Sequence, residues 1–143
     1  MRETVILSIL PAWADAILEG KKEWEYRRVA PRVDKGTRLI LYASHRRGAI
    51  VGEASIERII YEPVNDLLRH TIRETPHTRD EIKEYFKGLD YGSAIAVYKP
   101  RTYATPVTLE ELRKAVPGFR PPQSYQFLRP GDPSHRRILK MLP

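Results

Sequence analysis

The chain has 143 residues, of which 41% are hydrophobic and 30% are charged, and it contains no cysteine. This length and apolar content suit one domain with a packed core, and the missing cysteines exclude a disulfide framework, a thiolate metal site and a cysteine nucleophile. The longest apolar runs fall far short of the roughly 20 residues that span a bilayer. Because the sequence also opens directly on a strand pattern, we expect a cytoplasmic protein without a membrane partner.

The formal net charge of +7 is concentrated toward the end of the sequence. Residues 113–143 contain seven basic residues against the single acid Asp132, which accounts for +6 of the total. Local clusters of positive charge attract phosphate groups. Arg136, Arg137 and Lys140 are therefore candidate nucleic-acid contacts, with a basic, solvated terminal helix as the structural alternative.

The first part of the chain predicts a strand, a short helix and a second strand. Residues 4–10 are mostly apolar, and residues 11–19 form a helix whose opening Pro11 suits a first helical turn. Gly20 then supplies a left-handed C-terminal cap. Residues 23–29 change to period two, which predicts a strand immediately after this helix.

The two faces of the second strand carry different chemistry. Trp24 and Tyr26 fall on one face, where we expect core packing, with base stacking as the alternative. Glu25 and Arg27 fall on the other face, just after Lys22 at the end of the helix. These three charged residues could form a structural ion pair or line a polar cleft, and we favour the cleft.

A hairpin is predicted next, with strands at residues 37–44 and 49–60 joined by a tight basic reversal. Gly52 suggests a bulge or a close backbone approach within the second of these strands. Arg46 and Arg47 lie in the reversal, where an exposed tip can reach a phosphate backbone. An ordinary solvated turn is the alternative interpretation.

Two helices are predicted between this hairpin and the next strand. Residues 62–75 carry apolar side chains on one helical face, and the helix over residues 78–88 opens with a Thr-x-x-Glu capping box. Residues 93–103 resume the sheet. Pro100 marks a strand end or a bulge, because proline has no N–H to donate to the ladder.

The last third of the chain predicts a short helix at residues 108–115, opened by a second Thr-x-x-Glu capping box. Residues 117–124 are expected to be extended and irregular, and residues 125–128 to add an edge strand. A final helix, capped by Ser134 and ending at Leu142, is expected to dock on the sheet through its apolar face.

The segment at residues 119–127 interleaves aromatic rings with amide, hydroxyl and guanidinium groups. Such groups can stack a base and recognise its edge. Arg120, Gln123 and Ser124 are the side chains that we expect to be exposed for this purpose. In the structural alternative, which stays open, the phenylalanines of the segment pack into the barrel.

The spacing Gly20-x-Lys22-x-x-Glu25-x-Arg27 resembles the signature of the ASCH domain, the activating-signal-cointegrator homology module of the PUA-like superfamily. The predicted strands around it have the order and spacing of that family, and the match extends to about residue 105. The resemblance implies one α+β domain over residues 1–143. This domain would be a small β-barrel, mixed but largely antiparallel, with flanking helices and a charged cleft that family members are usually thought to use for RNA.

The resemblance and the charge distribution together predict an RNA-binding or modified-nucleoside-binding module, with RNA as the partner and no cofactor. Lys22 and Arg27 would hold a phosphate or an acidic edge, while Glu25 would orient Arg27 or accept from a base amine. The predicted nucleic-acid-binding residues are Lys22, Glu25, Arg27, Ser44, Arg46, Arg47, Arg120, Gln123, Ser124, Arg136, Arg137 and Lys140.

An enzymatic alternative comes from small bacterial members of the family that resemble amidohydrolases and deacetylate acetylated cytidine. In those members, a threonine that supplies the nucleophile occupies the position of Glu25, so the matched hydroxyl is missing here. Lys22 as a base and Glu25 would be the catalytic candidates, with Ser44 or Ser124 as substitute hydroxyls. We therefore expect a binding module rather than an enzyme and, if it is an enzyme, an amidohydrolase.

Two further expectations complete the sequence analysis. The four histidines, at positions 45, 70, 77 and 135, show no spacing typical of metal ligands, so we expect no metal site. A scaffold in a transcription or translation assembly is the third functional alternative, in which the charged face would contact a protein instead of RNA.

Overall fold

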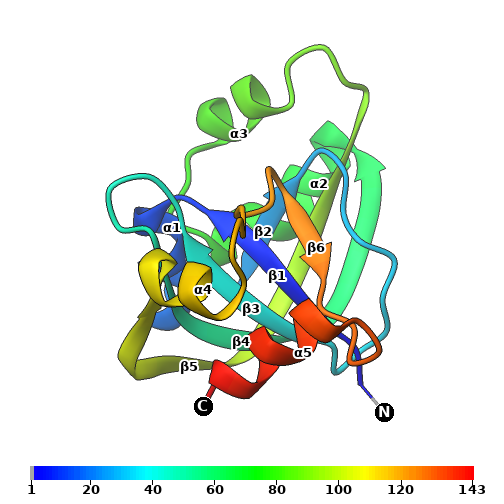
Figure 1. The fold of residues 1–143 in the computed structure, drawn as a ribbon. Helices are drawn as coiled ribbons and strands as arrows, with labels where there is room; N and C mark the ends of the chain where they lie inside the picture. Colours follow the sequence, from blue (N-terminus) through cyan, green and yellow to red (C-terminus); the bar gives the residue numbers. More distant parts are fainter. Residues whose placement is uncertain (1) are drawn as a thin grey trace.

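The structure, a computed structural model, describes residues 2–143. Their strands form a six-stranded sheet in the order β2-β5-β4-β3-β1-β6, strongly curled into an open half-barrel (Figure 1). The strands are β1 (Thr4–Ile9), β2 (Trp24–Arg27), β3 (Arg38–Ala43), β4 (Ala49–Pro63), β5 (Tyr91–Thr108) and β6 (Tyr125–Phe127). The predicted α+β, PUA-like architecture is confirmed.

Helices flank this sheet, as predicted. They are α1 (Pro11–Leu18), α2 (Val64–Thr71) with the 3₁₀ turn η1 (Ile72–Glu74), α3 (Arg79–Tyr85), α4 (Leu109–Ala115) and α5 (Pro133–Met141). Within residues 2–143, no helix is both long and apolar enough to cross a membrane.

Two predicted helix starts are wrong. The helix expected from residue 62 starts at Val64, because Glu62 and Pro63 still pair with β5 as the last residues of β4. The last helix is capped by Asp132 and not by Ser134. The carboxylate of Asp132 accepts hydrogen bonds from the N–H groups of Ser134 and His135, at 2.8 and 3.2 Å. A carboxylate at this position satisfies two N–H groups that the helix itself leaves unpaired.

The two glycines singled out in the sequence have the predicted roles. Gly20 has φ of +78°, so α1 ends in a left-handed residue, and the N–H groups of Lys21 and Lys22 both return to the carbonyl of Ala16. At Gly52 the ladder between β4 and β5 shifts register, and an added Cβ would lie 2.6 Å from the carbonyl oxygen of Arg101. Both the bulge and the close backbone approach are therefore present.

The sheet is mixed because β1 and β3 run parallel, whereas the other neighbours run antiparallel. The carboxyl ends of β1 and β3 therefore lie side by side, with Ser8 opposite Tyr42. Strands β2 and β6 form the two edges of the sheet, and its curl brings them toward each other. Residues from both edges and from the carboxyl ends of β1 and β3 can thus meet at one place.

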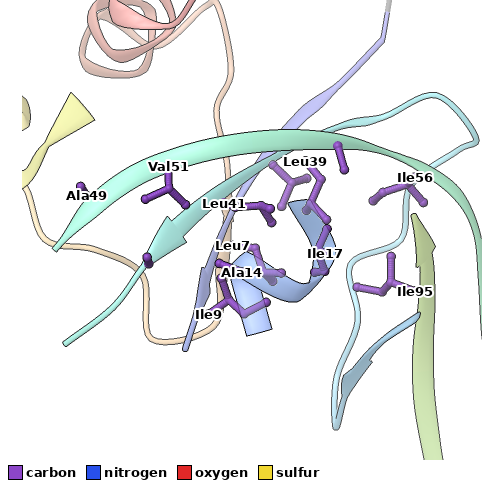
Figure 2. Packing of buried hydrophobic residues seen from close by; sticks show 13 residues of the cluster. Leu7, Ile9, Ala14, Ile17, Leu39, Leu41, Ala49, Val51, Ile56 and Ile95 are labelled. Atoms are coloured by element: carbon purple, nitrogen blue, oxygen red, sulfur yellow. The ribbon is translucent and has the colours of Figure 1, made fainter. Parts of the chain in front are cut away.

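The hydrophobic core holds these elements in position. Ala14 and Ile17 of α1 pack against Leu7, Leu39 and Leu41 on the concave face of the sheet (Figure 2). Helices α4 and α5 cover a second cluster on the convex side, which includes the buried Ile138. Helices α2 and α3 cover a third cluster with Trp24 and Tyr26, which are only 4% and 5% exposed. Core packing, the favoured interpretation of these two aromatic residues, is confirmed.

Candidate functional site

A cavity of about 680 Å³ lies where the carboxyl ends of β1 and β3 meet the edge strand β2. We call it the cleft. Trp13 of helix α1 lines the cleft on one side. Glu81 and Tyr85 of helix α3 line it together with His77 from the loop before α3, and Gln123 comes from the segment before β6. The charged side chains in its wall are Lys22, Glu25, Arg27, Arg28 and Glu81.

Lys22 is the most deeply buried charged side chain of the cleft, with only 2% of its surface exposed. Its ammonium nitrogen lies 2.6 Å from Nε2 of His77 and 3.4 Å from Oε1 of Glu25. The same nitrogen lies 5.1 and 5.7 Å from the ring centroids of Tyr26 and Trp13. Glu25 and the two aromatic faces thus compensate in part for the water that Lys22 has lost.

The contact between Lys22 and His77 restricts the protonation of the pair. Two nitrogens at 2.6 Å need one N–H donor and one free lone pair, so the two groups do not both carry a positive charge. Burial, together with the charge of Lys22, lowers the pKa of His77. Burial also lowers the pKa of Lys22 and outweighs the opposing effect of Glu25. An ammonium that donates to a neutral imidazole meets this requirement, and the carboxylate of Glu25 at 3.4 Å favours the charged form of Lys22.

Glu25 divides its two oxygens between two cations. Oε1 faces Lys22, while Oε2 accepts a hydrogen bond from Nε of Arg27 at 3.0 Å and forms an ion pair with Nη2 at 2.9 Å. With 5% of its surface exposed, Glu25 is itself buried. The predicted cluster of Lys22, Glu25 and Arg27 is therefore a connected group of charges inside the cleft.

Arg27 also reaches across the open side of the half-barrel. Its Nη2 donates to the carbonyl oxygen of Ser8 at 2.6 Å, and its Nη1 donates to Oγ of Ser124 at 3.3 Å. These contacts join edge strand β2 to β1 and to the segment that leads into β6. The guanidinium group is consequently held by several hydrogen bonds before any ligand arrives.

The segment before β6 has features of both interpretations of its sequence, the packing of phenylalanines into the barrel and the exposure of polar groups. The hydroxyl of Ser8 donates to the carbonyl of Pro122 at 2.6 Å, and its N–H donates to that of Ser124 at 2.9 Å. These bonds tie the segment to β1, so that Gln123 lines the cleft. Phe119 is buried in the second core cluster, and Phe127 packs against the first. The two phenylalanines are thus structural, Gln123 faces the cleft, and Ser124 contacts Arg27.

The predicted residues of the basic hairpin are divided between two surfaces. Ser44 lines the cleft, and its hydroxyl donates to the carbonyl of Ile9 at 3.2 Å. His45, which was not predicted, lines it as well. Arg46 is exposed. Arg47 donates two hydrogen bonds to Asp15, at 2.8 and 3.2 Å, and does not line the cleft.

The basic residues near the end of the sequence lie apart from this group. Arg120 is exposed, directly before the prolines that line the cleft. Arg136, Arg137 and Lys140 lie on α5, on the side of the sheet that packs the second core cluster, and do not line the cleft. The structure therefore does not bring these three residues together with Lys22 and Arg27.

Sequence reasoning missed His77, which was considered only as a metal ligand. Its side chain is 5% exposed, and its ring lies against Trp13 with the ring centroids 4.1 Å apart. Nδ1 is buried without an aligned hydrogen bond, and Oε2 of Glu81 lies 3.5 Å away. The one available signal was the capping box of Thr78 and Glu81, which orients a carboxylate next to the preceding residue.

The curled sheet and its charged cleft define a PUA-like module. The family model described as "Domain of unknown function (DUF365)" matches residues 3–118. An ASCH domain-containing ribonuclease from Zymomonas mobilis is 30% identical over 128 residues, which cover 90% of this chain and 86% of that protein. The chain therefore belongs to the DUF365 family of ASCH domain proteins, and the predicted resemblance is confirmed.

Comparison of structures agrees with this assignment. The crystal structure of ASCH from Zymomonas mobilis matches with a TM-score of 0.88 and 28% identity, covering 99% of this chain and 96% of that chain. A hypothetical protein from Leishmania major matches with a TM-score of 0.57 over 99% of this chain and 94% of that chain. At 17% identity, this second likeness shows the fold alone.

The expectation of a binding module rather than an enzyme, or otherwise of an amidohydrolase, is contradicted by the Zymomonas relative, which is named as a ribonuclease. The sequence argument required a protein hydroxyl at the position of Glu25, because hydrolysis of an amide needs an added nucleophile. RNA carries a hydroxyl of its own beside every phosphate. The missing threonine is therefore no argument against RNA cleavage. Within residues 2–143, no group of three or more His, Cys, Asp or Glu is arranged to hold a metal ion.

Proposed function

We propose that this protein is a ribonuclease that cleaves single-stranded RNA in the cleft, with Lys22, Arg27 and His77 as the reacting and phosphate-binding groups. The observation that carries the proposal is the buried ammonium–imidazole pair, with 2.6 Å between Lys22 Nζ and His77 Nε2, in the wall of a cavity of about 680 Å³. The similarity to the Zymomonas ribonuclease supplies the class of reaction.

The charge of the cleft favours a phosphate. The wall carries three positive and two negative side chains, and His77 is neutral when it accepts from Lys22. The positive ones are Lys22, Arg27 and Arg28, and the negative ones are Glu25 and Glu81. One positive charge is left over in a partly water-excluded place, where the attraction for an anion is stronger than at an exposed surface. A phosphodiester group carries the matching negative charge.

The proposed reaction needs no nucleophile from the protein. The 2′-oxygen of the ribose attacks the adjacent phosphorus and loses its proton to a base, while the bond from phosphorus to the 5′-oxygen breaks and that oxygen gains a proton from an acid. The products are a 2′,3′-cyclic phosphate and a 5′-hydroxyl. The chain has to supply one base, one acid and positive charge for the phosphorane oxygens.

His77 is the proposed base. When a phosphate draws the ammonium group of Lys22 toward itself, Nε2 of His77 loses its donor and gains a free lone pair. Burial and the charge of Lys22 lower the pKa of His77, so the ring is neutral before the reaction. Glu81, with Oε2 at 3.5 Å, favours a proton on Nδ1 and stabilises the imidazolium that forms.

Lys22 is the proposed acid. Burial lowers its pKa, and an ammonium group with a lowered pKa gives up its proton more readily to the departing 5′-oxygen. Arg27 remains charged throughout and holds a phosphate oxygen, and Glu25 keeps both cations in place. Arg46, Arg120, Gln123, Ser124 and the basic residues of α5 are proposed to guide the rest of the RNA strand.

The test is cleavage of a single-stranded RNA that carries one scissile ribonucleotide in an otherwise 2′-deoxy strand. We expect a 2′,3′-cyclic phosphate product and a loss of about a hundredfold or more in kcat for His77→Gln. The matched control is His70→Gln, because His70 of α2 is about half exposed and pairs with Glu62 of β4. Cleavage of the all-deoxy strand, or full activity in His77→Gln, would contradict the proposal.

A further inference from the structure

Two exposed aromatic side chains lie on the sheet outside the cleft. Tyr61 of β4 and Tyr91 of β5 expose 65% and 46% of their surfaces. The rings of Tyr61 and Tyr91 are stacked on each other, with their centroids 5.2 Å apart and 23° between their planes. We call these two residues the tyrosine patch.

The sheet register puts the tyrosine patch beside Arg27. Tyr61 of β4 lies opposite Ser93 of β5, and Ser93 lies opposite Arg27 of β2. Residues directly opposite each other on neighbouring strands present their side chains on the same face. Since strands lie about 4.8 Å apart, the Cα atoms of Tyr61 and Arg27 are separated by roughly 10 Å.

Tyr91 extends the patch along the same face. It lies opposite Pro63, two positions along β4 from Tyr61, and residues two apart in a strand share a face. The intervening Glu62 falls on the opposite face, where its carboxylate contacts the ring of His70 at 2.8 Å. The acidic side chain of Glu62 is therefore absent from the aromatic face, which is shared by Ser93 and Arg27.

We propose that the tyrosine patch is a base-stacking subsite that binds a nucleotide next to the phosphate held by Arg27. This inference deepens the proposed function and rests on it for the phosphate at Arg27. Stacked aromatic rings beside a cation bind bases of a single strand, because every base has a flat face and the backbone beside it is anionic. A duplex keeps its bases stacked inside and cannot use such a surface.

The experiment measures binding apart from cleavage. The probe is a fluorescein-labelled single-stranded RNA with 2′-O-methyl ribose at every position, which cannot react through its 2′-oxygen. Anisotropy titrations compare the wild-type protein with Tyr61→Ala, Tyr61→Phe and the control Tyr98→Ala, a half-buried tyrosine of β5 that lies opposite Ser55. Circular dichroism verifies that each variant is folded.

We expect Tyr61→Ala to weaken binding roughly tenfold, because stacking on one aromatic ring is worth this much per base. Tyr61→Phe keeps the ring and should bind like the wild-type protein, as should Tyr98→Ala. A probe with a 2-aminopurine base should lose fluorescence on binding to the wild-type protein but less so with Tyr61→Ala. A duplex of the same sequence should show no dependence on Tyr61.

Three results would overturn the subsite. In the first, Tyr61→Ala binds RNA as tightly as the wild-type protein. In the second, Tyr61→Phe loses as much RNA affinity as Tyr61→Ala. In the third, Tyr61→Ala changes the oligomeric state at unchanged RNA affinity, which would assign the patch to a protein contact. The proposed function is tested separately. If the protein binds RNA through Tyr61 but never cleaves it, the subsite is supported and the proposed ribonuclease function is contradicted. If the protein cleaves RNA and Tyr61→Ala binds normally, the ribonuclease function is supported and the subsite is contradicted.

Discussion

Two buried glutamates, Glu25 on β2 and Glu53 on β4, each hold cationic side chains, yet their surroundings differ. Glu53 accepts from Arg38 at 2.7 and 3.0 Å, from Arg101 at 2.9 Å and from the hydroxyl of Tyr103 at 2.7 Å. Both arginines also donate to the carbonyl oxygen of Pro143. The donors around Glu53 therefore find their acceptors within the protein.

The pKa values agree with a structural role for the Glu53 cluster. Burial alone would raise the pKa of Glu53, but the hydrogen bonds and charges of its neighbours outweigh burial and keep this pKa below its ordinary value. Burial and the contact with Glu53 raise the pKa of Tyr103. The carboxylate is thus charged and the phenol protonated at neutral pH. The cluster ties β3, β4 and β5 to Pro143.

The Glu25 cluster is incomplete by comparison. Lys22 meets one carboxylate oxygen at 3.4 Å and otherwise donates to His77, a base that can be replaced by a phosphate. Nδ1 of His77 is buried without an aligned partner. The comparison indicates that a buried ion cluster is structural where its donors are all used internally. A buried ion cluster whose proton donor and acceptor face a cavity is a candidate functional site.

The strongest way to test this comparison is to remove Lys22. We expect Lys22→Met to lower kcat/KM for RNA cleavage by about a hundredfold or more, because it removes the proposed acid and a phosphate contact. The free energy of unfolding should change little, because the variant loses the ion pair with Glu25 but no longer buries an ammonium group away from water. Glu25 keeps Arg27 as its partner. Rate assays and urea unfolding measure the two effects. The matched control is Lys21→Met, because Lys21 is exposed and pairs with the half-exposed Glu19 at 3.3 Å. A large loss of stability with normal activity per folded molecule would make Lys22 structural.

The opposite result is expected at Glu53. Glu53→Gln should lower the free energy of unfolding by about 3 kcal/mol, because it leaves the largely buried guanidinium group of Arg38 without its carboxylate. Cleavage per folded molecule should stay unchanged. Urea unfolding of Glu57→Gln provides the control, since the pair of Glu57 with Lys35 at 3.2 Å is mostly exposed and should contribute less than about 1 kcal/mol. A stable but inactive Glu53→Gln would reverse the assignment of the two clusters.

The pH dependence of kcat/KM tests the two proposed protonation states. His77 acts as the neutral base and its pKa is lowered, so the acidic limb should lie below the ordinary value of 6.5. Lys22 acts as the protonated acid and its pKa is also lowered, so the alkaline limb should lie below 10.5. The two groups are in contact, so each limb reports the pair. An acidic limb above 6.5 that is unchanged in His77→Gln would rule out His77 as the base.

The same shift in His77 makes a prediction for stability. Because the folded protein holds His77 with a lowered pKa, the unfolded chain takes up this proton first as the pH falls through 6.5. The free energy of unfolding should therefore decrease from pH 6.5 down to the pKa of His77 in the folded protein. Urea unfolding at several pH values should show a weaker decrease in His77→Gln, and an equal decrease would contradict the prediction.

Much of the fold could be predicted because its signals are local. The end of α1 at Gly20 follows from one residue, and the capping boxes that open α3 and α4 are formed as their four-residue spacing predicts. Period two after residue 22 placed Glu25 and Arg27 on one face. The cluster of Lys22 with these two residues was therefore predictable from a stretch of six residues.

The other half of the site could not be predicted in this way. His77 contacts Lys22 across 55 residues, and Arg27 contacts Ser124 across 97. These pairs depend on the curl of the sheet and on the docking of α3, which no local spacing encodes. The stacked pair of Tyr61 and Tyr91 likewise depends on the register between β4 and β5.

The smallest expected effect concerns the basic residues of α5, which lie outside both glutamate clusters. If Arg136, Arg137 and Lys140 contact RNA only through phosphates, each contact contributes about −0.7 to the slope of log K against log salt. Neutralising all three should flatten this slope by up to about 2 and leave kcat unchanged, because none of them lines the cleft. Arg27→Ala should instead remove one phosphate contact and lower kcat. Circular dichroism verifies that α5 stays folded, which its buried Ile138 favours. An unchanged affinity and slope in the folded triple variant would make α5 a solvated surface, so that RNA binding would depend on the cleft and the tyrosine patch.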